Sequence, residues 1–226
     1  MEYVQSLVDF EDLTGFIIVR HPFERLVSTY RNKVEFNSKY IFKGFVSKTV
    51  RQYRSKAIRK FGIKHFNKLK NFAKTLPQKR NEENPAVIGS HTPLPSFWEF
   101  VQPLIYDYEG IQDEYVYCHI RPIYDHCCIC NEDQLKVFRY IMKAEELYNE
   151  APAFIRHMGW ENIVNVNEPN INVQRPDELT SKEITQLYFK QLSGDEVLSL
   201  YNLYELDFLL FNYTFRFGDI VLPTTH

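Results

Sequence analysis

The sequence predicts an α/β protein in which strands of a parallel sheet alternate with helices. Two observations lead to this prediction. A short apolar run at residues 15–19 is rich in β-branched residues, which is typical of a buried strand in a parallel sheet. In the segments that follow it, apolar residues recur at steps of three and four, which is the spacing of helices.

The composition is that of one globular domain. The chain has 226 residues, of which 44% are hydrophobic and 25% are charged, and this excludes a disordered or fibrous chain. No stretch approaches the roughly 18–20 consecutive apolar residues that a membrane-spanning helix needs. No secretory signal peptide is visible. We therefore expect a single domain over residues 1–226.

The predicted strand is broken at Pro22, and a helix follows directly. From Phe23 to about Phe36, apolar side chains recur at helical spacing. Pro22 suits the first turn of this helix because its missing N–H would have no helical partner there. Glu24 suits the positive end of the helix dipole. A strand followed at once by a helix is the unit from which parallel α/β sheets are built.

Further helices and a second strand complete the prediction. The apolar spacing predicts helices at about residues 45–61 and 193–211. Ser96 is expected to cap another helix, with Glu99 as the reciprocal partner in a capping box. Residues 115–120, which are rich in tyrosine, valine and isoleucine, are predicted to form a strand that leads into a cysteine-rich loop.

Charge is distributed unevenly along the chain. The segment 39–80 holds fourteen Lys and Arg and no Asp or Glu, although the net charge of the whole chain is −2. Such a block suggests an anionic partner, and a solvated helix face is the alternative. Aromatic residues between the cations would allow stacking on nucleic-acid bases. Their helical spacing favours a core instead, and no nucleic-acid-binding motif is present, so we expect no nucleic-acid partner.

The four cysteines of the chain fall within thirteen residues: Cys118, Cys127, Cys128 and Cys130. A structural zinc site needs two separated ligand pairs, and the segment supplies only one regular pair. We therefore expect no metal. A local disulfide in an oxidising compartment is the better prediction, and free thiols are the alternative.

The most informative segment is residues 16–33. The predicted strand places Arg20 at the carboxyl edge of the sheet, where open α/β sheets bind ligands. The helix that follows carries Arg25 and Ser28 in its first two turns. A phosphate at this point would meet a guanidinium, a hydroxyl and the positive end of a helix together. We therefore predict an anion site that includes Arg20 and Ser28.

This segment resembles the 3′-phosphate-binding element of Golgi carbohydrate sulfotransferases. The shared pattern is Arg-x-Pro-Phe-Glu-Arg-Leu-Val-Ser-x-Tyr-Arg-x-Lys. The likeness is greatest to the branch that contains the chondroitin, dermatan and GalNAc 4-O-sulfotransferases and HNK-1 sulfotransferase. These enzymes use 3′-phosphoadenosine-5′-phosphosulfate (PAPS) as the sulfuryl donor. The resemblance implies that Arg20 and Ser28 bind the 3′-phosphate of PAPS, while Arg25 supports this site or braces its loop.

Later segments resemble the same branch in the same order. The positions that match its His-Trp-x-Pro-x-x-x-x-Cys-x-x-Cys segment are His119, Pro122, Cys127 and Cys130. Ile120 stands where the branch has Trp. Residues 97–101 and 204–213 resemble two further signatures of the branch. The resemblance implies a P-loop-like sulfotransferase fold with a central parallel sheet flanked by helices.

The sequence also departs from the branch. Members carry a Pro-Lys-x-x-x-Thr/Ser loop for the 5′-phosphosulfate, and no such loop precedes Phe16. Their Gly-Lys-x-Glu segment is replaced by Phe-Arg-Tyr-Ile at residues 138–141. We therefore expect an N-terminally incomplete sulfotransferase domain, without its first strand and 5′-phosphosulfate loop, that has weak activity or none. The alternative is a degenerate relative that binds a glycan or nucleotide without catalysis.

Two histidines are candidates for the base that takes the proton of the acceptor hydroxyl, because imidazole titrates near working pH. The resemblance favours His119 over His91. A hydrogen-bonded structural role is the alternative for His119, and a structural or surface role is the alternative for His91. The acceptor implied by the family is a glycosaminoglycan or an N-glycan, and the basic segment 39–80 is where we expect it to bind.

The family also implies a location. The full-length protein would be a Golgi membrane enzyme whose catalytic domain faces the lumen and whose N-terminal anchor lies outside this chain. Cys127 and Cys130 would be oxidised there, although four cysteines allow three full pairings. Asn212 begins an Asn-Tyr-Thr glycosylation sequon, which fits passage through the secretory pathway.

Overall fold

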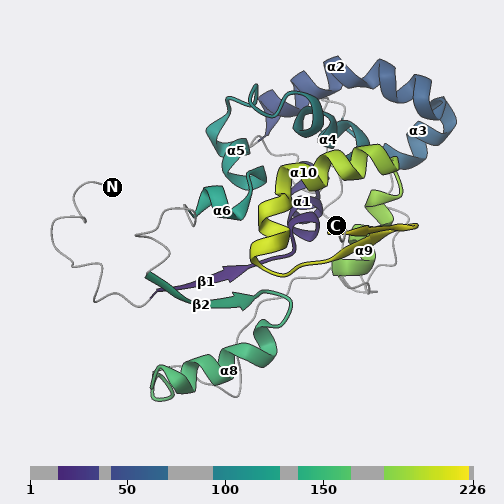
Figure 1. The fold of residues 1–226 in the computed structure, drawn as a ribbon. Coiled ribbons are helices and arrows are strands. Elements are labelled where there is room, and N and C mark those ends of the chain that lie inside the picture. Colours follow the sequence, from purple (N-terminus) through teal and green to yellow (C-terminus); the bar gives the residue numbers. More distant parts are fainter. Residues whose placement is uncertain (1–14, 36–41, 71–93, 128–136, 164–180, 224–226) are drawn as a thin grey trace, which may run out of the picture. The chain divides into compact units, whose positions relative to one another are not determined.

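The computed structural model describes residues 15–35, 42–70, 94–127, 137–163 and 181–223. Contacts within the chain divide it into two compact units. The first comprises Met1–His21 and Pro122–Gln174, and the second comprises Pro22–Arg121 and Arg175–His226. The α/β class is confirmed, and most of the described regular structure is helical (Figure 1). A single domain over residues 1–226 stays a prediction.

The first unit is built on a parallel pair of strands. Its elements are β1 (Gly15–Val19), α6 (Ile123–His126), β2 (Phe138–Lys143) and α8 (Leu147–His157). Strands β1 and β2 run parallel, as the sequence predicts for β1, with Phe16 opposite Tyr140. The ring of Phe154 in α8 contacts both of them, with its centroid 5.1 Å from that of Phe16 and 5.3 Å from that of Tyr140. Helix α8 therefore packs on the face of the sheet that carries these two rings (Figure 1).

Strand β1 is less buried than the sequence predicts. Ile17 and Val19 are buried, whereas Phe16 and Ile18 are 42% and 46% exposed. Side chains of a strand alternate between the two faces of a sheet, so these pairs lie on opposite faces. The described residues therefore bury one face of β1 and leave the other partly accessible.

The second unit is mostly helical. Its elements are α1 (Pro22–Tyr30), the π-helical turn η2 (Arg31–Glu35), α2 (Lys43–Phe61), α3 (Ile63–Lys70), α4 (Phe97–Tyr106), α5 (Glu114–Ile120), α9 (Ser181–Phe189), α10 (Gly194–Leu210), β3 (Phe215–Phe217) and β4 (Ile220–Leu222). Strands β3 and β4 pair in an antiparallel hairpin. The helices predicted after Pro22, after Ser96 and at about residues 45–61 and 193–211 are confirmed as α1, α4, α2 and α10.

Helix α1 packs against α9 and α10 and carries the aromatic core of this unit (Figure 1). Phe23 is fully buried, and its ring contacts three others with centroids 4.5–5.0 Å apart: Phe189, Phe208 and Phe215. Two turns later, Tyr30 packs on another aromatic group: Phe97, Phe100 and Tyr188. Aromatic side chains bury large areas, so the two ends of α1 are held firmly in place.

Two capping boxes begin α4 and α10. The carboxylates of Glu99 and Glu196 each accept a hydrogen bond of 2.7 Å from the backbone N–H of the N-cap serine, Ser96 or Ser193. Each carboxylate also holds a cation of α2: Arg54 at 2.7 Å and Lys60 at 2.9 Å respectively. The capping carboxylates therefore attach the basic helix α2 to the starts of α4 and α10.

Residues 115–120 form part of helix α5, so the strand predicted there is wrong. The carboxylate of Asp113 caps this helix by accepting from the N–H groups of Tyr115 and Val116. The buried positions are Val116 and Ile120, which lie four residues apart on one helix face. The aromatic and β-branched composition favours a strand, but the cap and the buried pair favour a helix and decide the outcome.

Candidate functional site

Arg20 follows β1 directly and is half-buried. The backbone on both sides of it is tied to the residues after β2. The N–H of His21 donates to a carboxylate oxygen of Glu145 at 2.7 Å, and the N–H of Ala144 donates to the carbonyl of Val19 at 2.8 Å. The end of β1, next to Arg20, is therefore held by two residues of the same unit, Ala144 and Glu145.

Ser28 lies in α1, which belongs to the second unit. Every residue of α1 is buried except Arg25 and Ser28, which are half-buried. These two are three positions apart and therefore share one face of the helix. The polar residues that the sequence singles out on this helix are thus the ones with access to solvent. That Ser28 and Arg20 bind one phosphate stays a prediction.

Arg25 has partners within its own unit. Its guanidinium donates to the carbonyl of Arg121 at 2.5 Å and lies 3.9 Å from the carboxylate of Asp207, which is fully buried. Its guanidinium carbon lies 5.9 Å from the centre of the Tyr204 ring. These contacts brace α1 against the end of α5 and against α10. That Arg25 also supports a phosphate site stays a prediction.

Three side chains close the C-terminal end of α5, where the last carbonyls of a helix have no helical partners. The hydroxyl of Thr29 donates to the carbonyl of His119 at 3.2 Å, and the hydroxyl of Tyr204 donates to the carbonyl of Ile120 at 2.6 Å. The guanidinium of Arg25 donates to the carbonyl of Arg121 at 2.5 Å. Burial raises the pKa of Tyr204, so its hydroxyl stays protonated and able to donate. The backbone at His119 is therefore fixed by α1 and α10 together.

His119 is half-buried on α5. Its Nδ1 lies 2.7 Å from the backbone carbonyl of Tyr115, one turn earlier. Because a carbonyl only accepts hydrogen bonds, Nδ1 carries a proton in this contact, and in the uncharged form of the ring the lone pair is then on Nε2. The thiol of Cys118 also lies 3.2 Å from Nδ1. This tautomer is the one that a general base acting through Nε2 needs. The second candidate base, His91, lies outside the described residues.

The basic segment forms α2 and α3 within the described range 42–70. Four of the aromatic residues between its cations are buried: Phe42, Phe45, Tyr53 and Phe66. Phe61 is half-buried, and its ring contacts those of His65 and Trp98. The four buried rings belong to the core, as their helical spacing predicts, and are not available to stack on nucleic-acid bases.

Cys127 is half-buried at the end of α6, whereas Cys128 and Cys130 lie outside the described residues. The disulfide between Cys127 and Cys130 therefore stays a prediction. Within the described ranges, no group of three or more His, Cys, Asp or Glu is arranged to hold a metal ion. No helix in those ranges is long and apolar enough to cross a membrane.

The sequon at Asn212 follows α10. Asn212 is exposed and has a φ of 50°, a left-handed conformation that asparagine tolerates better than most residues. Thr214, the third residue of the sequon, is also exposed. The side chain that would carry a glycan is therefore accessible.

The sequence of the chain is similar to those of known proteins. The sequence profile of the sulfotransferase family matches residues 5–214. The chain is 27% identical to carbohydrate sulfotransferase 8 of Mus musculus, over 92% of this chain and 41% of that protein. It is 28% identical to carbohydrate sulfotransferase 9 of Homo sapiens, over 90% and 38%. For carbohydrate sulfotransferase 11 of Rattus norvegicus the identity is 29%, over 88% and 46%.

The chain thus spans about two fifths of the length of these curated relatives. No solved structure matches it.

Proposed function

The chain belongs to the sulfotransferase family, and from this premise we propose that it is part of a carbohydrate O-sulfotransferase. The reaction would transfer a sulfuryl group from PAPS to a sugar hydroxyl of a glycosaminoglycan or a glycoprotein glycan. The observation that carries the proposal is the family match over residues 5–214, which includes the β1–α1 segment with Arg20 and Ser28. The names of the relatives support a carbohydrate acceptor.

The residues at the β1–α1 segment fit the 3′-phosphate of the donor. The planar guanidinium of Arg20 suits two phosphate oxygens at once, and the hydroxyl of Ser28, which is accessible on α1, adds a further donor. PAPS supplies the sulfuryl group when it is bound. Because the 3′-phosphate is remote from that group, Arg20 and Ser28 position the donor and do not act on the reacting atoms.

We assign the proton transfer to His119. Sulfuryl transfer resembles phosphoryl transfer in that positioning and charge stabilisation dominate, with a base near the attacking oxygen. The bond from Nδ1 to the carbonyl of Tyr115 keeps Nε2 as the acceptor of a proton. The carbonyl of His119 is held by Thr29, so the base sits on a fixed stretch of backbone.

We also propose that the protein works in the lumen of the Golgi, with a membrane anchor supplied outside residues 1–226. The exposure of Asn212 supports this proposal because a sequon can be glycosylated only where the glycosylating enzyme of the secretory pathway can reach its asparagine. A disulfide that includes Cys127 and Cys130 would fit the same oxidising compartment.

The proposed function is tested by measuring which nucleotides the chain binds. The probes are adenosine 3′,5′-bisphosphate (PAP), which is the donor without its sulfuryl group, and two analogues, adenosine 2′,5′-bisphosphate and AMP. By isothermal titration calorimetry we expect PAP to bind at least about tenfold more tightly than either, because a hydrogen bond to a charged group is worth about 1.5–3 kcal/mol. The 2′,5′ isomer has the charge of PAP and controls for simple electrostatic attraction. Equal affinity for the two bisphosphates would contradict the proposal.

A further inference from the structure

Three polar side chains of α1 and η2 contact α5 in regular order. They stand four positions apart in the sequence: Arg25, Thr29 and Lys33. The first two donate to backbone carbonyls at the C-terminal end of α5. The third donates from its ammonium to the hydroxyl of Tyr115, near the start of α5, at 3.4 Å. One face of α1 and η2 therefore follows α5 along its length, and Lys33 lies at the far end of this contact.

Tyr115 brings Lys33 and the proposed base together. The ring centroid of Tyr115 lies 4.7 Å from that of His119, and its backbone carbonyl lies 2.7 Å from Nδ1 of the same histidine. The Nζ atom of Lys33 lies 5.7 Å from the centre of the Tyr115 ring. Tyr115 is 44% exposed, so a ligand can reach this part of the surface. A cation and a base therefore share one accessible neighbour.

The turn that carries Lys33 is fixed at its end. π-Helical turns such as η2 are rare and are found frequently at functional sites. The last two residues of this turn, Val34 and Glu35, are buried. The carboxylate of Glu35 accepts a hydrogen bond of 2.5 Å from the hydroxyl of Tyr188, whose pKa is raised by burial so that it stays protonated. The backbone at Lys33 is therefore anchored to the core.

The charge of Lys33 is not neutralised by any described residue. Three other half-buried cations of the same unit each have a carboxylate within 3.9 Å: Arg25, Arg31 and Arg54. Lys33 is also half-buried, but in the described part of the chain it forms no ion pair, and the hydroxyl of Tyr115 is a neutral acceptor. Partial burial of a charged group costs free energy unless an opposite charge compensates. The position of Lys33 therefore favours an anionic ligand.

The proposed function, on which this inference rests, identifies the anion. A base that serves the acceptor hydroxyl lies close to the sulfuryl group that this hydroxyl attacks, so a cation beside the base is close to the same group. The 3′-phosphate is assigned elsewhere, to Arg20 and Ser28. We propose that the ammonium of Lys33 binds the sulfuryl group of PAPS and that the hydroxyl of Tyr115 orients this ammonium. Lys33 thereby stabilises negative charge on the group that is transferred.

The test compares two nucleotides that differ in the sulfuryl group. PAPS carries this group and PAP lacks it. Their net charges are similar near neutral pH, because the sulfuryl group adds one negative charge and removes one from the phosphate that holds it. Affinities are measured by isothermal titration calorimetry without an acceptor. We expect Lys33→Gln to weaken PAPS at least about tenfold and PAP by no more than about twofold, because it removes a charge-assisted hydrogen bond to the sulfuryl group alone.

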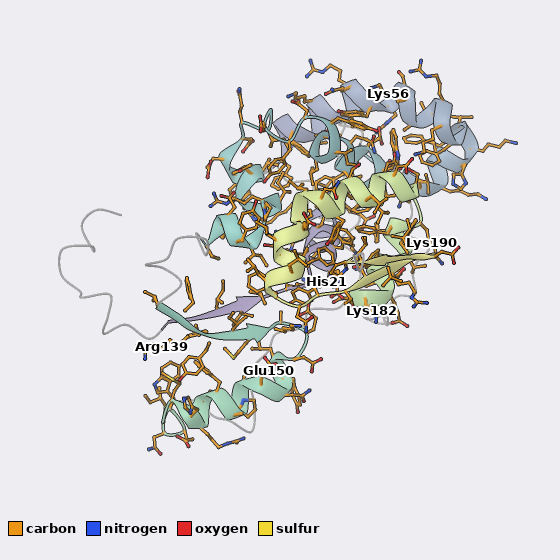
Figure 2. The ribbon with its side chains drawn as sticks, in the orientation of Figure 1. His21, Lys56, Arg139, Glu150, Lys182 and Lys190 are labelled. Atoms are coloured by element: carbon orange, nitrogen blue, oxygen red, sulfur yellow. The ribbon has the colours of Figure 1, made fainter. Side chains whose placement is uncertain are left out.

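Two further variants make the test specific. Lys182→Gln removes an exposed cation from α9 of the same unit, which is labelled in Figure 2, and should change neither affinity. Tyr115→Phe keeps the ring beside His119 and removes only the hydroxyl that orients Lys33. We expect it to weaken PAPS by about threefold and to leave PAP unchanged, since one neutral hydrogen bond is lost. If Lys33→Gln melts at a lower temperature than the wild type, Tyr115→Phe takes its place as the deciding variant.

The other outcomes decide against the proposal. Equal losses of PAPS and PAP in Lys33→Gln would show that Lys33 acts on the fold or on a phosphate that both nucleotides carry. Unchanged affinity for PAPS would show that Lys33 only packs on Tyr115. A loss of PAPS binding in Lys182→Gln as large as that in Lys33→Gln would show a general effect of charge.

This proposal and the proposed function fail separately. The preference for PAP over adenosine 2′,5′-bisphosphate tests the donor site, and the comparison of PAPS with PAP tests Lys33. A chain that prefers PAP to the isomer but shows no selective loss of PAPS in Lys33→Gln would keep the donor site and refute the role of Lys33. A wild type that binds neither PAPS nor PAP would refute both.

Discussion

Replacing Arg20 with alanine should weaken the binding of PAP by about 10- to 100-fold and leave the binding of AMP unchanged. This range corresponds to the roughly 1.5–3 kcal/mol that a hydrogen bond to a charged group contributes. The binding free energy of PAP should fall by about this amount when the guanidinium that contacts its phosphate is removed. AMP has no 3′-phosphate, so it does not report the loss. Calorimetric titration of both nucleotides into the wild type and the variant measures the difference.

Two further variants make this test specific. Ser28→Ala should weaken PAP binding by a smaller factor of about 3 to 10, because a neutral hydroxyl contributes less than a guanidinium. Arg156→Ala removes an exposed guanidinium from α8 in the same unit and should change neither affinity. If Arg20→Ala weakened PAP and AMP equally, Arg20 would have no role specific to the 3′-phosphate.

The second large effect concerns stability. Glu196→Ala should lower the free energy of unfolding by about 3 kcal/mol, because the carboxylate of Glu196 accepts hydrogen bonds from three different parts of the fold. It accepts from the N–H of Ser193 at 2.7 Å, from the indole of Trp98 at 2.7 Å and from Lys60 at 2.9 Å. Without it, α10 loses its cap, and the buried indole N–H of Trp98 loses its partner.

The contribution of Glu196 should depend on pH. Burial alone would raise the pKa of Glu196, but hydrogen bonds from Ser193, Lys60 and Trp98 outweigh it and lower the pKa below its ordinary value of 4.5. The unfolded chain therefore binds this proton more readily than the folded chain does. The stabilisation is complete well above pH 4.5 and is lost as the pH falls through the lowered pKa.

Urea unfolding followed by fluorescence measures both effects. Trp98 reports on this site, and a Trp160→Phe background removes the other tryptophan of the chain. The difference in stability between the wild type and Glu196→Gln should shrink as the pH is lowered from 7 towards 3. Glu205→Gln, an exposed change on the same helix, should cost less than about 0.5 kcal/mol at every pH. A pH-independent difference for Glu196→Gln would show that its charge does not stabilise the fold.

Helices with local start signals were predictable from the sequence. The capping boxes at Ser96 and Ser193 and the proline at the start of α1 are signals that act within one turn, and the structure confirms all three helices. The apolar spacing of α2 is equally local, since its buried positions recur every four residues.

Elements that depend on distant partners were not predictable. Strand β2 pairs with β1 across more than 100 residues, and its sequence has no clear pattern of its own. Helix α5 is composed of residues that favour strands. Its last carbonyls accept hydrogen bonds from Thr29 of α1 and Tyr204 of α10. Tertiary contacts override local preference in both cases.

In the candidate site, too, the residues could be predicted from the sequence, whereas their contacts with distant parts of the chain could not. Arg20 and Ser28 stood out by residue type and spacing, and His119 by the resemblance to the sulfotransferase branch. Nothing in the sequence indicated that Nδ1 of His119 would donate to the carbonyl of Tyr115. Thr29 was missed because it is an ordinary residue beside Ser28. Its role is visible only once α5 is a helix whose end lies against α1.

The most direct test of the donor site is a crystal structure of the chain with PAP bound. We predict that the guanidinium of Arg20 and the hydroxyl of Ser28 both lie within hydrogen-bonding distance of the 3′-phosphate, about 2.7–3.2 Å. A complex in which PAP binds elsewhere, or in which only one of the two groups reaches that phosphate, would contradict the account.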